Sequence, residues 1–357
     1  MSRAVVTGSS GFVGKHLTST LAKQGTTVVA LDVVAGAAGE NIVPCKADLR
    51  DKASLAPAIE GADVVYHVAS RVQTRHTGAD EVFEINVGGT RNLLAACRDK
   101  GVNKVVYVSS ASVVYDGKDV ERGDEKLAYP SSFHAPYAKT KAVAEGEVLE
   151  ADGKGGVRTC AIRPHVVFGP GDTRFLPAVL GRAKSGKLKA YVGSPEKLSD
   201  FTYVDNLVDG LLLAADKVDG PAGGQAYFVT NGEPMAFWEF IGRVLDGLGY
   251  PRPRYRVPFP IAYGAAAVRE WVDAARGIPT SEESLTRFAI RYLTTHHYFS
   301  HEKATKDLGY LPKVNLVEGI RRTVENLKGT SGVEASGSGR SASGGAGAAG
   351  SAEAPAA

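Results

Sequence analysis

The chain has 357 residues, of which 42 are Lys or Arg and 39 are Asp or Glu, so its formal net charge at pH 7 is +3. This length can bury a substantial core in one large domain or two smaller ones. The charges are balanced and form no sustained basic stripe, which argues against a nucleic-acid partner. Cys45, Cys97 and Cys160 lie far apart and form no C-x-x-C pair, so neither a metal site nor a disulfide is expected and a reducing compartment fits best.

The two ends of the chain bear on localisation. A first strand is expected from about Arg3, which leaves no room for a cleavable targeting peptide and favours a start in the cytosol. No apolar run approaches the roughly 20 residues that a membrane-spanning helix needs. Residues 329–357 are rich in Ser, Gly and Ala, and we expect them to form a disordered tail.

Three glycines near the N-terminus carry the first functional signal. Gly8, Gly11 and Gly14 stand between a short β-branched run and a helical apolar pattern. Gly8 permits a tight turn, Gly11 lets the backbone approach phosphate groups, and Gly14 lets the helix pack close to the sheet. A strand-turn-helix of this kind holds the pyrophosphate of a dinucleotide at the helix N-terminus.

Asp32 indicates which dinucleotide is bound. It follows a second predicted strand, where an acidic side chain accepts hydrogen bonds from a ribose 2′-hydroxyl and repels a 2′-phosphate. Val33 and Val34 add no compensating positive charge. The pattern predicts NAD rather than NADP, and a turn or capping role for Asp32 is the alternative.

The first half of the chain alternates short apolar runs with segments of helical periodicity, seen best over residues 79–100 and 136–150. This alternation predicts an α/β fold with a doubly wound parallel sheet of the Rossmann type. After Arg163 and Pro164 the rhythm changes. We expect a dinucleotide-binding domain over residues 1–163 and a smaller, interleaved substrate-binding region over residues 164–328. The strands are expected at residues 4–7, 28–31, 64–68, 105–108 and 159–162.

Tyr137 and Lys141 carry the second functional signal, because residues four apart share one face of a helix. A cation about 4 Å from a phenol favours the phenolate by up to ~4 kcal/mol at an effective dielectric near 20. This could lower the pKa of Tyr137 from about 10 by up to roughly three units. Such a tyrosine can take a proton from an alcohol while hydride leaves the same carbon for a nicotinamide.

Three serines follow the predicted strand that precedes this helix. A hydroxyl there can orient the reacting oxygen toward the tyrosine. We expect Ser110 to have this role, whereas at least two of Ser109, Ser110 and Ser112 only cap or turn the chain.

These features resemble the extended short-chain dehydrogenases/reductases over about residues 3–328. The resemblance implies that Asp48 and Leu49 lie near the adenine, that Ala69 lines the cofactor, and that Asn86 supports the active site. It implies catalysis by Tyr137, Lys141 and Ser110 without a metal. The matching motifs are the glycine turn, Asp48-Leu49, His67 to Ser70, Asn86 to Thr90, Tyr137 with Lys141, and Arg163 to Asp172. The implied cofactor-binding residues are Gly8, Ser10, Gly11, Phe12, Val13, Gly14, Asp32, Asp48, Leu49, Ala69, Asn86, Lys141 and Pro164.

Residues 109–117, 200–206, 225–240 and 295–304 narrow the resemblance to the 3β-hydroxysteroid dehydrogenase branch. They are most similar to the decarboxylating sterol-4α-carboxylate 3-dehydrogenases of sterol C4 demethylation, especially the plant-type ones. The implied reaction is NAD-dependent oxidation of a 3β-hydroxyl to a 3-ketone with loss of the C4 carboxylate as carbon dioxide. Residues 192–199 depart from the glycine-asparagine loop usual in that group, which affects the edge of the substrate pocket.

The same resemblance implies a sterol substrate, other sterol demethylation enzymes as partners, a homodimer, and peripheral attachment to the cytosolic face of the endoplasmic reticulum. Residues 258–272 are rich in Ala, aromatic and aliphatic side chains and suit a sterol, a membrane surface or a buried helix. Without membrane attachment the protein would be cytoplasmic. A cation would help to hold the carboxylate, and Arg71, Arg75 and His76 lie on a plausible loop, although we interpret them first as solvated residues.

Three other functions use part of the same signals. Another 3β-hydroxysteroid or 3-keto-lipid dehydrogenase or reductase would need the same catalytic pair. A nucleotide-sugar epimerase or dehydratase would need it too, together with polar sugar contacts in the second region. A non-catalytic NAD-binding sensor would have no need of Tyr137, Lys141 and Ser110 together.

Overall fold

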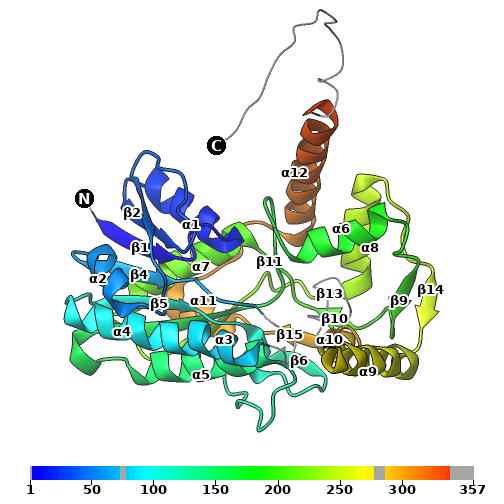
Figure 1. Ribbon diagram of the computed structural model, residues 1–357, viewed down its shortest axis with the longest axis horizontal. Coiled ribbons are helices and arrows are strands. Elements are labelled where there is room, and N and C mark those ends of the chain that lie inside the picture. The colour runs from blue at the N-terminus through cyan, green and yellow to red at the C-terminus, as the bar shows by residue number, and fades with distance from the viewer. Residues whose placement is uncertain (1, 73–77, 277–285, 338–357) are drawn as a thin grey trace, which may run out of the picture.

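The computed structural model describes residues 2–72, 78–276 and 286–337. Within these residues the largest sheet has seven strands, all parallel, in the spatial order β12-β7-β5-β4-β1-β2-β3 (Figure 1). The predicted doubly wound parallel sheet is therefore confirmed. Its strands are β1 (Arg3–Thr7), β2 (Thr27–Asp32), β3 (Ile42–Lys46), β4 (Val64–His67), β5 (Lys104–Val108), β7 (Arg158–Pro164) and β12 (Ala226–Val229).

Alternate residues of each strand pack against two separate helical layers, because successive side chains of a strand point to opposite faces. In β1, Val5 faces one layer and Val6 faces the other, and both are fully buried. One layer comprises α2 (Lys52–Ile59), α4 (Gly89–Asp99) and α5 (Pro136–Glu150). The other comprises α1 (Phe12–Lys23), α7 (Val204–Lys217) and α11 (Glu302–Leu308), as Figure 1 shows.

Five of the seven strands lie where the sequence predicts them, within two residues at each end. β3 and β12 are the two that the sequence did not predict. β3 is a half-buried edge strand that contains Pro44, so its apolar signal is weak. β12 comes from the second half of the chain and pairs with β7, so residues beyond 163 complete the sheet.

The second half also builds a core of its own around aromatic rings. Phe201 and Phe240 stack with their ring centres 3.8 Å apart, and Phe168 packs edge-on against both. The helices of this half that lie outside the two layers are α6 (Phe175–Lys184), α8 (Phe237–Leu248), α9 (Phe259–Ala275), α10 (Arg287–Tyr292) and α12 (Leu316–Gly337). The short strands outside the main sheet are β6 (Val120–Gly123), β8 (Val167–Phe168), β9 (Ala190–Val192), β10 (Leu198–Ser199), β11 (Thr202–Tyr203), β13 (Met235–Ala236), β14 (Tyr255–Val257) and β15 (His297–Phe299).

The helix predicted over residues 79–100 is present but not uniform. It begins as α3 (Ala79–Phe83), widens into a π-helical turn at Glu84–Gly88, and continues as α4. This turn contains Asn86, whose side chain is buried. π-helical turns within α-helices often occur at functional sites. Elsewhere in the described part of the chain, two 3₁₀ helices lie at Ala111–Val114 and Lys154–Gly156.

α12 extends into the segment for which the sequence predicts a disordered tail. The sequence predicts disorder from residue 329, but the backbone remains helical to Gly337. Leu316, Ile320 and Val324 anchor this helix in the second core, and a helix once started gains one backbone hydrogen bond for each residue added. Residues 338–357, the rest of the predicted tail, lie outside the described residues. Among the helices of the described residues, none is both long and apolar enough to cross a membrane.

Candidate active site

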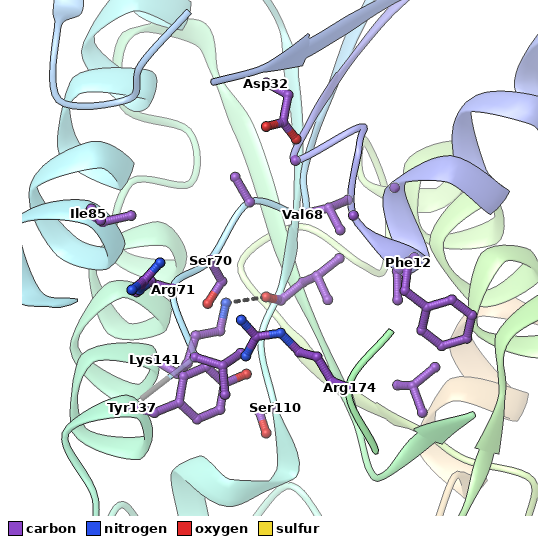
Figure 2. Close-up of a pocket in the computed structure, with 18 of the residues that line it drawn as sticks. Phe12, Asp32, Val68, Ser70, Arg71, Ile85, Ser110, Tyr137, Lys141 and Arg174 are labelled. Carbon is purple, nitrogen blue, oxygen red and sulfur yellow. Dashed lines mark hydrogen bonds between the residues drawn. The ribbon is translucent and has the colours of Figure 1, made fainter. Parts of the chain in front are cut away.

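A cavity of about 710 Å³ lies at the carboxyl ends of β1, β4 and β5, where the strand order reverses (Figure 2). Open α/β sheets bind ligands at such a switch point, and this volume suits a cofactor with a substrate. Most residues predicted to bind the cofactor or to act in catalysis lie on its wall. They are Gly8, Gly11, Phe12, Val13, Gly14, Asp32, Asp48, Leu49, Ala69, Ser110, Tyr137, Lys141 and Pro164.

The glycine turn fits a dinucleotide because its backbone is packed too closely for side chains. Gly8 has φ +70°, and a Cβ there would lie 2.7 Å from the Cα of Ala69. A Cβ on Gly14 would lie 2.1 Å from the carbonyl oxygen of Gly8. α1 begins at Phe12 without a side-chain cap, so its first backbone N–H groups are available to an anion at the cavity wall.

The carboxylate of Asp32 is held at the cavity wall by the backbone. Its Oδ2 accepts from the Ser10 N–H at 3.0 Å, and its Oδ1 accepts from the Val34 N–H at 3.2 Å. Ser10 itself does not line the cavity. Its hydroxyl donates to the Val34 carbonyl at 2.9 Å, so it braces the turn. Each oxygen of Asp32 retains a lone pair with which to accept a ribose hydroxyl.

Arg50 is a cavity-lining cation that the sequence analysis missed. Its Nε and Nη2 donate to Asp48 Oδ2 at 3.1 Å and 2.6 Å, and these hydrogen bonds lower the pKa of Asp48. The guanidinium is thus already paired with a carboxylate at the position where the family resemblance puts the adenine. The close spacing of Asp48 and Arg50 after β3 is the signal that could have found this pair.

Asn86 does not line the cavity but fixes two segments that do. Its Oδ1 accepts from the Arg71 N–H at 2.7 Å, and its Nδ2 donates to the Arg71 carbonyl and the Thr140 hydroxyl, each at 3.0 Å. Thr140 lies on α5 between Tyr137 and Lys141. Asn86 is therefore a positioning residue that ties the segment after β4 to the helix carrying the tyrosine.

A buried hydrogen-bond chain connects the backbone of Asn86 to Thr7, the last residue of β1 before the glycine turn. The Thr7 hydroxyl accepts two backbone N–H groups after β4 and so donates to His67 Nδ1 at 2.8 Å. His67 Nε2 then donates to Thr90 Oγ1 at 2.9 Å, and Thr90 donates to the Asn86 carbonyl at 2.6 Å. Burial, with a smaller effect of Lys141, lowers the pKa of His67 to about 3, so this imidazole is neutral and structural.

Tyr137 projects from the first turn of α5 into the cavity (Figure 2). Burial raises the pKa of its phenol above 10, whereas Ser110, Arg174 and Ser70 act in the opposite direction. The prediction that Lys141 lowers this pKa is therefore wrong for this structure.

The environment of Lys141 explains why this lysine does not lower the pKa of Tyr137 as expected. Its amino group donates to the Val108 carbonyl, the hydrogen bond drawn as a dashed line from Lys141 in Figure 2. The same group lies 4.0 Å from the centre of the Tyr107 ring. Burial lowers the pKa of Lys141 to about 7, although Glu145 acts to raise it. Near neutral pH this amine carries only part of a positive charge, so it favours a phenolate less than a solvated lysine would.

Of the three serines after β5, Ser110 is the one whose hydroxyl lowers the pKa of the Tyr137 phenol. Its Oγ also accepts from the Ser112 N–H at 3.2 Å and thereby caps the 3₁₀ turn at Ala111–Val114. Ser112 is buried and does not line the cavity. Ser109 does line it, but its hydroxyl has no hydrogen-bond partner among the described residues. The arrangement favours Ser110 as the hydroxyl that orients a substrate oxygen.

Two arginines, Arg71 and Arg174, also line the cavity (Figure 2). Arg71 is exposed, in keeping with its interpretation as a solvated loop residue, whereas Arg75 and His76 lie outside the described residues. Arg174 was missed by the sequence analysis. The available signal was its position just after Asp172, the residue that ends the last family motif.

The segment at residues 192–199 does not line the large cavity. Gly193 and Ser194 instead line a second cavity of about 430 Å³ at the start of α9, together with Arg256 and Arg291. The departure of this segment from the usual sequence therefore affects the surface near α9.

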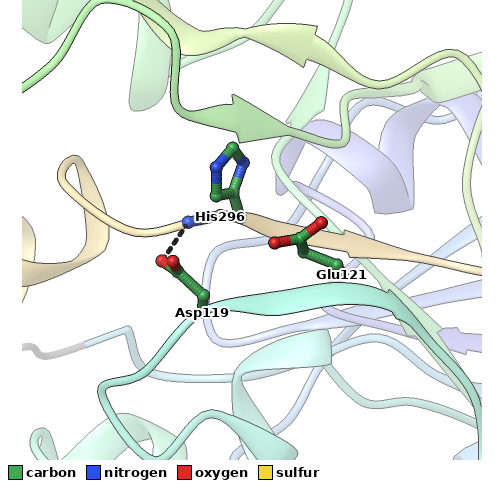
Figure 3. Close-up of side chains that lie close together, drawn as sticks. All are labelled: Asp119, Glu121 and His296. Atoms are coloured by element: carbon green, nitrogen blue, oxygen red, sulfur yellow. Dashed lines mark hydrogen bonds between the residues drawn. The ribbon is translucent and has the colours of Figure 1, made fainter.

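One further group of side chains has the composition of a metal site, but it forms protein contacts. Asp119, Glu121 and His296 lie together and exposed or half-exposed (Figure 3). Asp119 accepts from the His296 N–H at 2.8 Å and pairs with Lys197, also at 2.8 Å. His296 Nδ1 accepts from the Leu198 N–H at 3.1 Å. These bonds join β6, β10 and β15, and nothing in the group points to a bound ion.

The doubly wound sheet, the glycine turn at its switch point, and a tyrosine and lysine four residues apart define the class of short-chain dehydrogenases/reductases. Residues 5–261 match the model of the 3-beta hydroxysteroid dehydrogenase/isomerase family, and the chain belongs to that family.

The relatives of the chain include enzymes with decarboxylating names. The chain is 37% identical over 330 residues to the mouse (Mus musculus) protein named sterol-4-alpha-carboxylate 3-dehydrogenase, decarboxylating, and the match covers 91% of each. It is 37% identical over 347 residues to 3beta-hydroxysteroid-dehydrogenase/decarboxylase isoform 2 of Arabidopsis thaliana, covering 90% of this chain and 61% of that protein.

Solved structures with the same fold include the crystal structure of gox2253. It has a TM-score of 0.74 and 26% identity, and the match covers 92% of this chain and 99% of that one. The UDP-glucose 4-epimerase of Thermus thermophilus in complex with NAD has a TM-score of 0.70 and 25% identity, with the same coverage.

Proposed function

We propose that this protein oxidises the 3β-hydroxyl of a 4α-carboxysterol to a 3-ketone with NAD, and that the C4 carboxylate leaves as carbon dioxide. The observation that carries the proposal is that Tyr137 and Ser110 lie on the same cavity wall as the glycine turn and Asp32. The decarboxylating names of the relatives support the choice of substrate.

The cofactor-binding residues are those of the tightly packed turn. The N-terminus of α1 would hold the pyrophosphate, and Asp32 would accept the hydroxyls of the adenosine ribose. NAD, when bound, accepts a hydride from the carbon that carries the hydroxyl. Lys141, which also lines the cavity, would hydrogen-bond the nicotinamide ribose.

The catalytic work of the chain is to hold and move one proton. Ser110 and Tyr137 would both hydrogen-bond the 3-hydroxyl, which fixes its direction toward the cofactor. Because burial raises the pKa of Tyr137, this phenol must first lose its own proton, which Ser110 and Arg174 favour. As hydride leaves C3, the hydroxyl proton would then pass to the ionised Tyr137 oxygen.

Decarboxylation then follows from the chemistry of the product. The new ketone at C3 is β to the carboxylate at C4, so the bond between C4 and the carboxyl carbon can break with its electrons delocalised into an enolate. The protonated Tyr137 is placed to return its proton to the enolate oxygen. No separate decarboxylation cofactor is required.

The test is a substrate panel with purified protein and NAD. A 4α-carboxy-3β-hydroxysterol labelled with carbon-13 in the carboxyl group should give NADH and labelled carbon dioxide in equal amounts, together with a 3-ketosterol. The panel includes a 3β-hydroxysteroid without the carboxylate and a UDP-sugar. Accumulation of labelled 3-keto acid would mean oxidation without coupled decarboxylation, and rapid turnover of the UDP-sugar would overturn the sterol assignment.

We further propose that α9 attaches the protein to the cytosolic surface of the endoplasmic reticulum. Ala262 and Ala266 are buried, so one face of this helix packs on the protein. The opposite face presents Ile261, Val268 and Trp271, which are 64%, 64% and 72% exposed. An interfacial helix of this kind buries its apolar side chains among lipid headgroups.

The charge beside α9 favours an anionic phospholipid surface as the occupant of this face. Arg256 and Arg291 line the neighbouring cavity, and no carboxylate among the described residues lines it. Basic residues near a membrane surface are attracted to anionic lipids by about 1 kcal/mol each. Partner enzymes of sterol demethylation and a homodimer stay predictions from the family resemblance.

Sedimentation with phosphatidylcholine vesicles, with and without phosphatidylserine, tests this attachment. The wild type should sediment with the anionic vesicles, and Val268→Asp should not. Val317→Asp is the matched control, because Val317 is also 64% exposed but lies on α12. A wild type that ignores both vesicles would overturn the proposal, as would a dimer that Val268→Asp dissociates.

A further inference from the structure

Arg174 is a cation at the active site without an assigned partner. It stands at the N-terminus of α6 and lines the cavity, where Figure 2 shows its guanidinium directed toward Tyr137. Its side chain is exposed, and among the described residues no ion pair joins it to a carboxylate. Its charge is one of the influences that lower the pKa of Tyr137, which places the two side chains within electrostatic reach.

The backbone of Arg174 is fixed although its side chain is not. The carboxylate of Asp172 accepts the N–H groups of Arg174 at 2.8 Å, Phe175 at 3.1 Å and Leu176 at 2.9 Å. Leu176 is fully buried in the second core. Asp172 therefore uses its oxygens to start α6 and leaves the guanidinium available to a ligand.

We propose that Arg174 binds the C4 carboxylate of the substrate and so selects carboxylated sterols over neutral ones. This inference rests on the proposed function. In that substrate the carboxylate is attached to the carbon next to C3, so a substrate whose hydroxyl contacts Tyr137 presents its carboxylate close by. The guanidinium offers two parallel N–H donors that match the two oxygens of a carboxylate.

A sterol fills the cavity with hydrocarbon, which strengthens this contact. As water leaves, the ion pair forms in a medium of lower dielectric, where charged hydrogen bonds are worth more than at an exposed surface. A neutral 3β-hydroxysterol would instead leave the guanidinium unpaired against an apolar ligand, which costs binding free energy. Arg174 therefore favours binding of the carboxysterol and disfavours binding of the neutral sterol.

Arg71 provides the matched comparison on the same wall. It is also an exposed arginine without an ion pair to a described carboxylate, and its backbone is held by Asn86. Unlike Arg174, it is not among the groups that influence the pKa of Tyr137. Replacing each arginine in turn therefore distinguishes two effects. Loss of Arg71 removes a positive charge from the cavity wall, whereas loss of Arg174 removes the positive charge beside the reacting hydroxyl.

The experiment measures kcat/KM for a 4α-carboxy-3β-hydroxysterol and for the same sterol with a methyl group in place of the carboxylate. Arg174→Met should lower kcat/KM for the carboxysterol by about 10- to 100-fold more than for the methyl sterol, mainly through KM, whereas any loss that arises from the higher pKa of Tyr137 should be common to both substrates. Arg174→Lys should fall between, because lysine keeps the charge without the paired donors. Arg71→Met should not change the ratio between the two substrates.

Three outcomes would be decisive. Equal losses on both substrates would make Arg174 part of the general machinery around Tyr137 and overturn the proposal. Unchanged kcat/KM for both substrates in Arg174→Met, with a thermal unfolding midpoint like that of the wild type, would overturn it as well. A wild type that oxidises neither sterol would instead reject the proposed function, so the two failures are distinguishable.

Discussion

Lys141 donates a hydrogen bond to the backbone carbonyl of Val108 and thereby ties α5 to the carboxyl end of β5. Tyr137 lies on α5, and Ser110 lies two residues after the end of β5; these are the two hydroxyls proposed to hold the substrate oxygen. Because the lysine is buried at this junction, its removal should affect the shape of the site as well as its charge.

Tyr137→Phe should abolish most turnover without loss of cofactor affinity. The change removes only the oxygen that takes the proton, and general base catalysis contributes about 10²- to 10⁴-fold to a rate. NAD titration should give a dissociation constant close to that of the wild type, because the glycine turn is untouched. Tyr255→Phe, at a position 69% exposed on β14, is the control. Near-normal turnover in Tyr137→Phe would reject its catalytic assignment.

Lys141→Met should weaken both turnover and NAD binding, and it should also change how stability depends on pH. Folding lowers the pKa of Lys141 from 10.5 to about 7, so between these values the unfolded chain binds more protons than the folded one. In that window Lys141 makes the free energy of unfolding rise with pH. The wild type should therefore gain stability relative to Lys141→Met as the pH rises from about 7 toward 10.5.

Urea unfolding at several pH values measures this difference. Lys118→Met, at a lysine whose side chain is 82% exposed, should show no such trend relative to the wild type. A constant difference between wild type and Lys141→Met would show that Lys141 keeps its ordinary pKa in the folded protein.

The sequence predicts the features that depend on periodicity and spacing. Five buried parallel strands and α5 follow from apolar runs and helical spacing, and the glycine turn follows from backbone sterics. The same reasoning brings Tyr137 and Lys141 to one wall of the cavity but misjudges the pKa of Tyr137. That pKa depends on burial by segments distant in the sequence, which periodicity does not encode.

The features that the sequence missed come from tertiary contacts. Arg174 reaches the cavity because the segment after β7 folds back over the carboxyl ends of the strands, and nothing local distinguishes it from a solvated arginine. β12 joins the sheet only through its pairing with β7. Asn86 was assigned to the cofactor, whereas its hydrogen bonds to Arg71 and Thr140 place it behind the wall.

Asp32 should make the protein select NAD over NADP. A 2′-phosphate would meet the carboxylate, and Arg50, the cavity-lining cation in the segment after β3, is already paired with Asp48. We expect NAD to bind about 10- to 100-fold more tightly, and Asp32→Asn to remove most of this preference while keeping an acceptor for the backbone. Fluorescence titration of the wild type and of Asp32→Asn with both cofactors measures this ratio of affinities. Equal affinities in the wild type would show that Asp32 does not contact the ribose.

Arg163 and Glu145 form the buried ion pair that fixes α5 against β7. Their side chains are only 5% and 0% exposed, and Arg163 Nη2 lies 2.6 Å from Glu145 Oε1. Arg163→Met should lower the free energy of unfolding by about 3–5 kcal/mol, because it leaves the Glu145 carboxylate buried without its cation.

Urea unfolding of Arg163→Met, Glu145→Leu and the double variant distinguishes the contribution of the ion pair to the free energy of unfolding from that of side-chain packing. Removing both charges leaves no buried ion unpaired, so the double variant should be more stable than the sum of the two single losses predicts. Because Glu145 also raises the pKa of Lys141, Glu145→Leu should lower that pKa further, and its turnover should begin to fall at a lower pH than that of the wild type. Strictly additive losses in the double variant would show that the two side chains stabilise the fold independently.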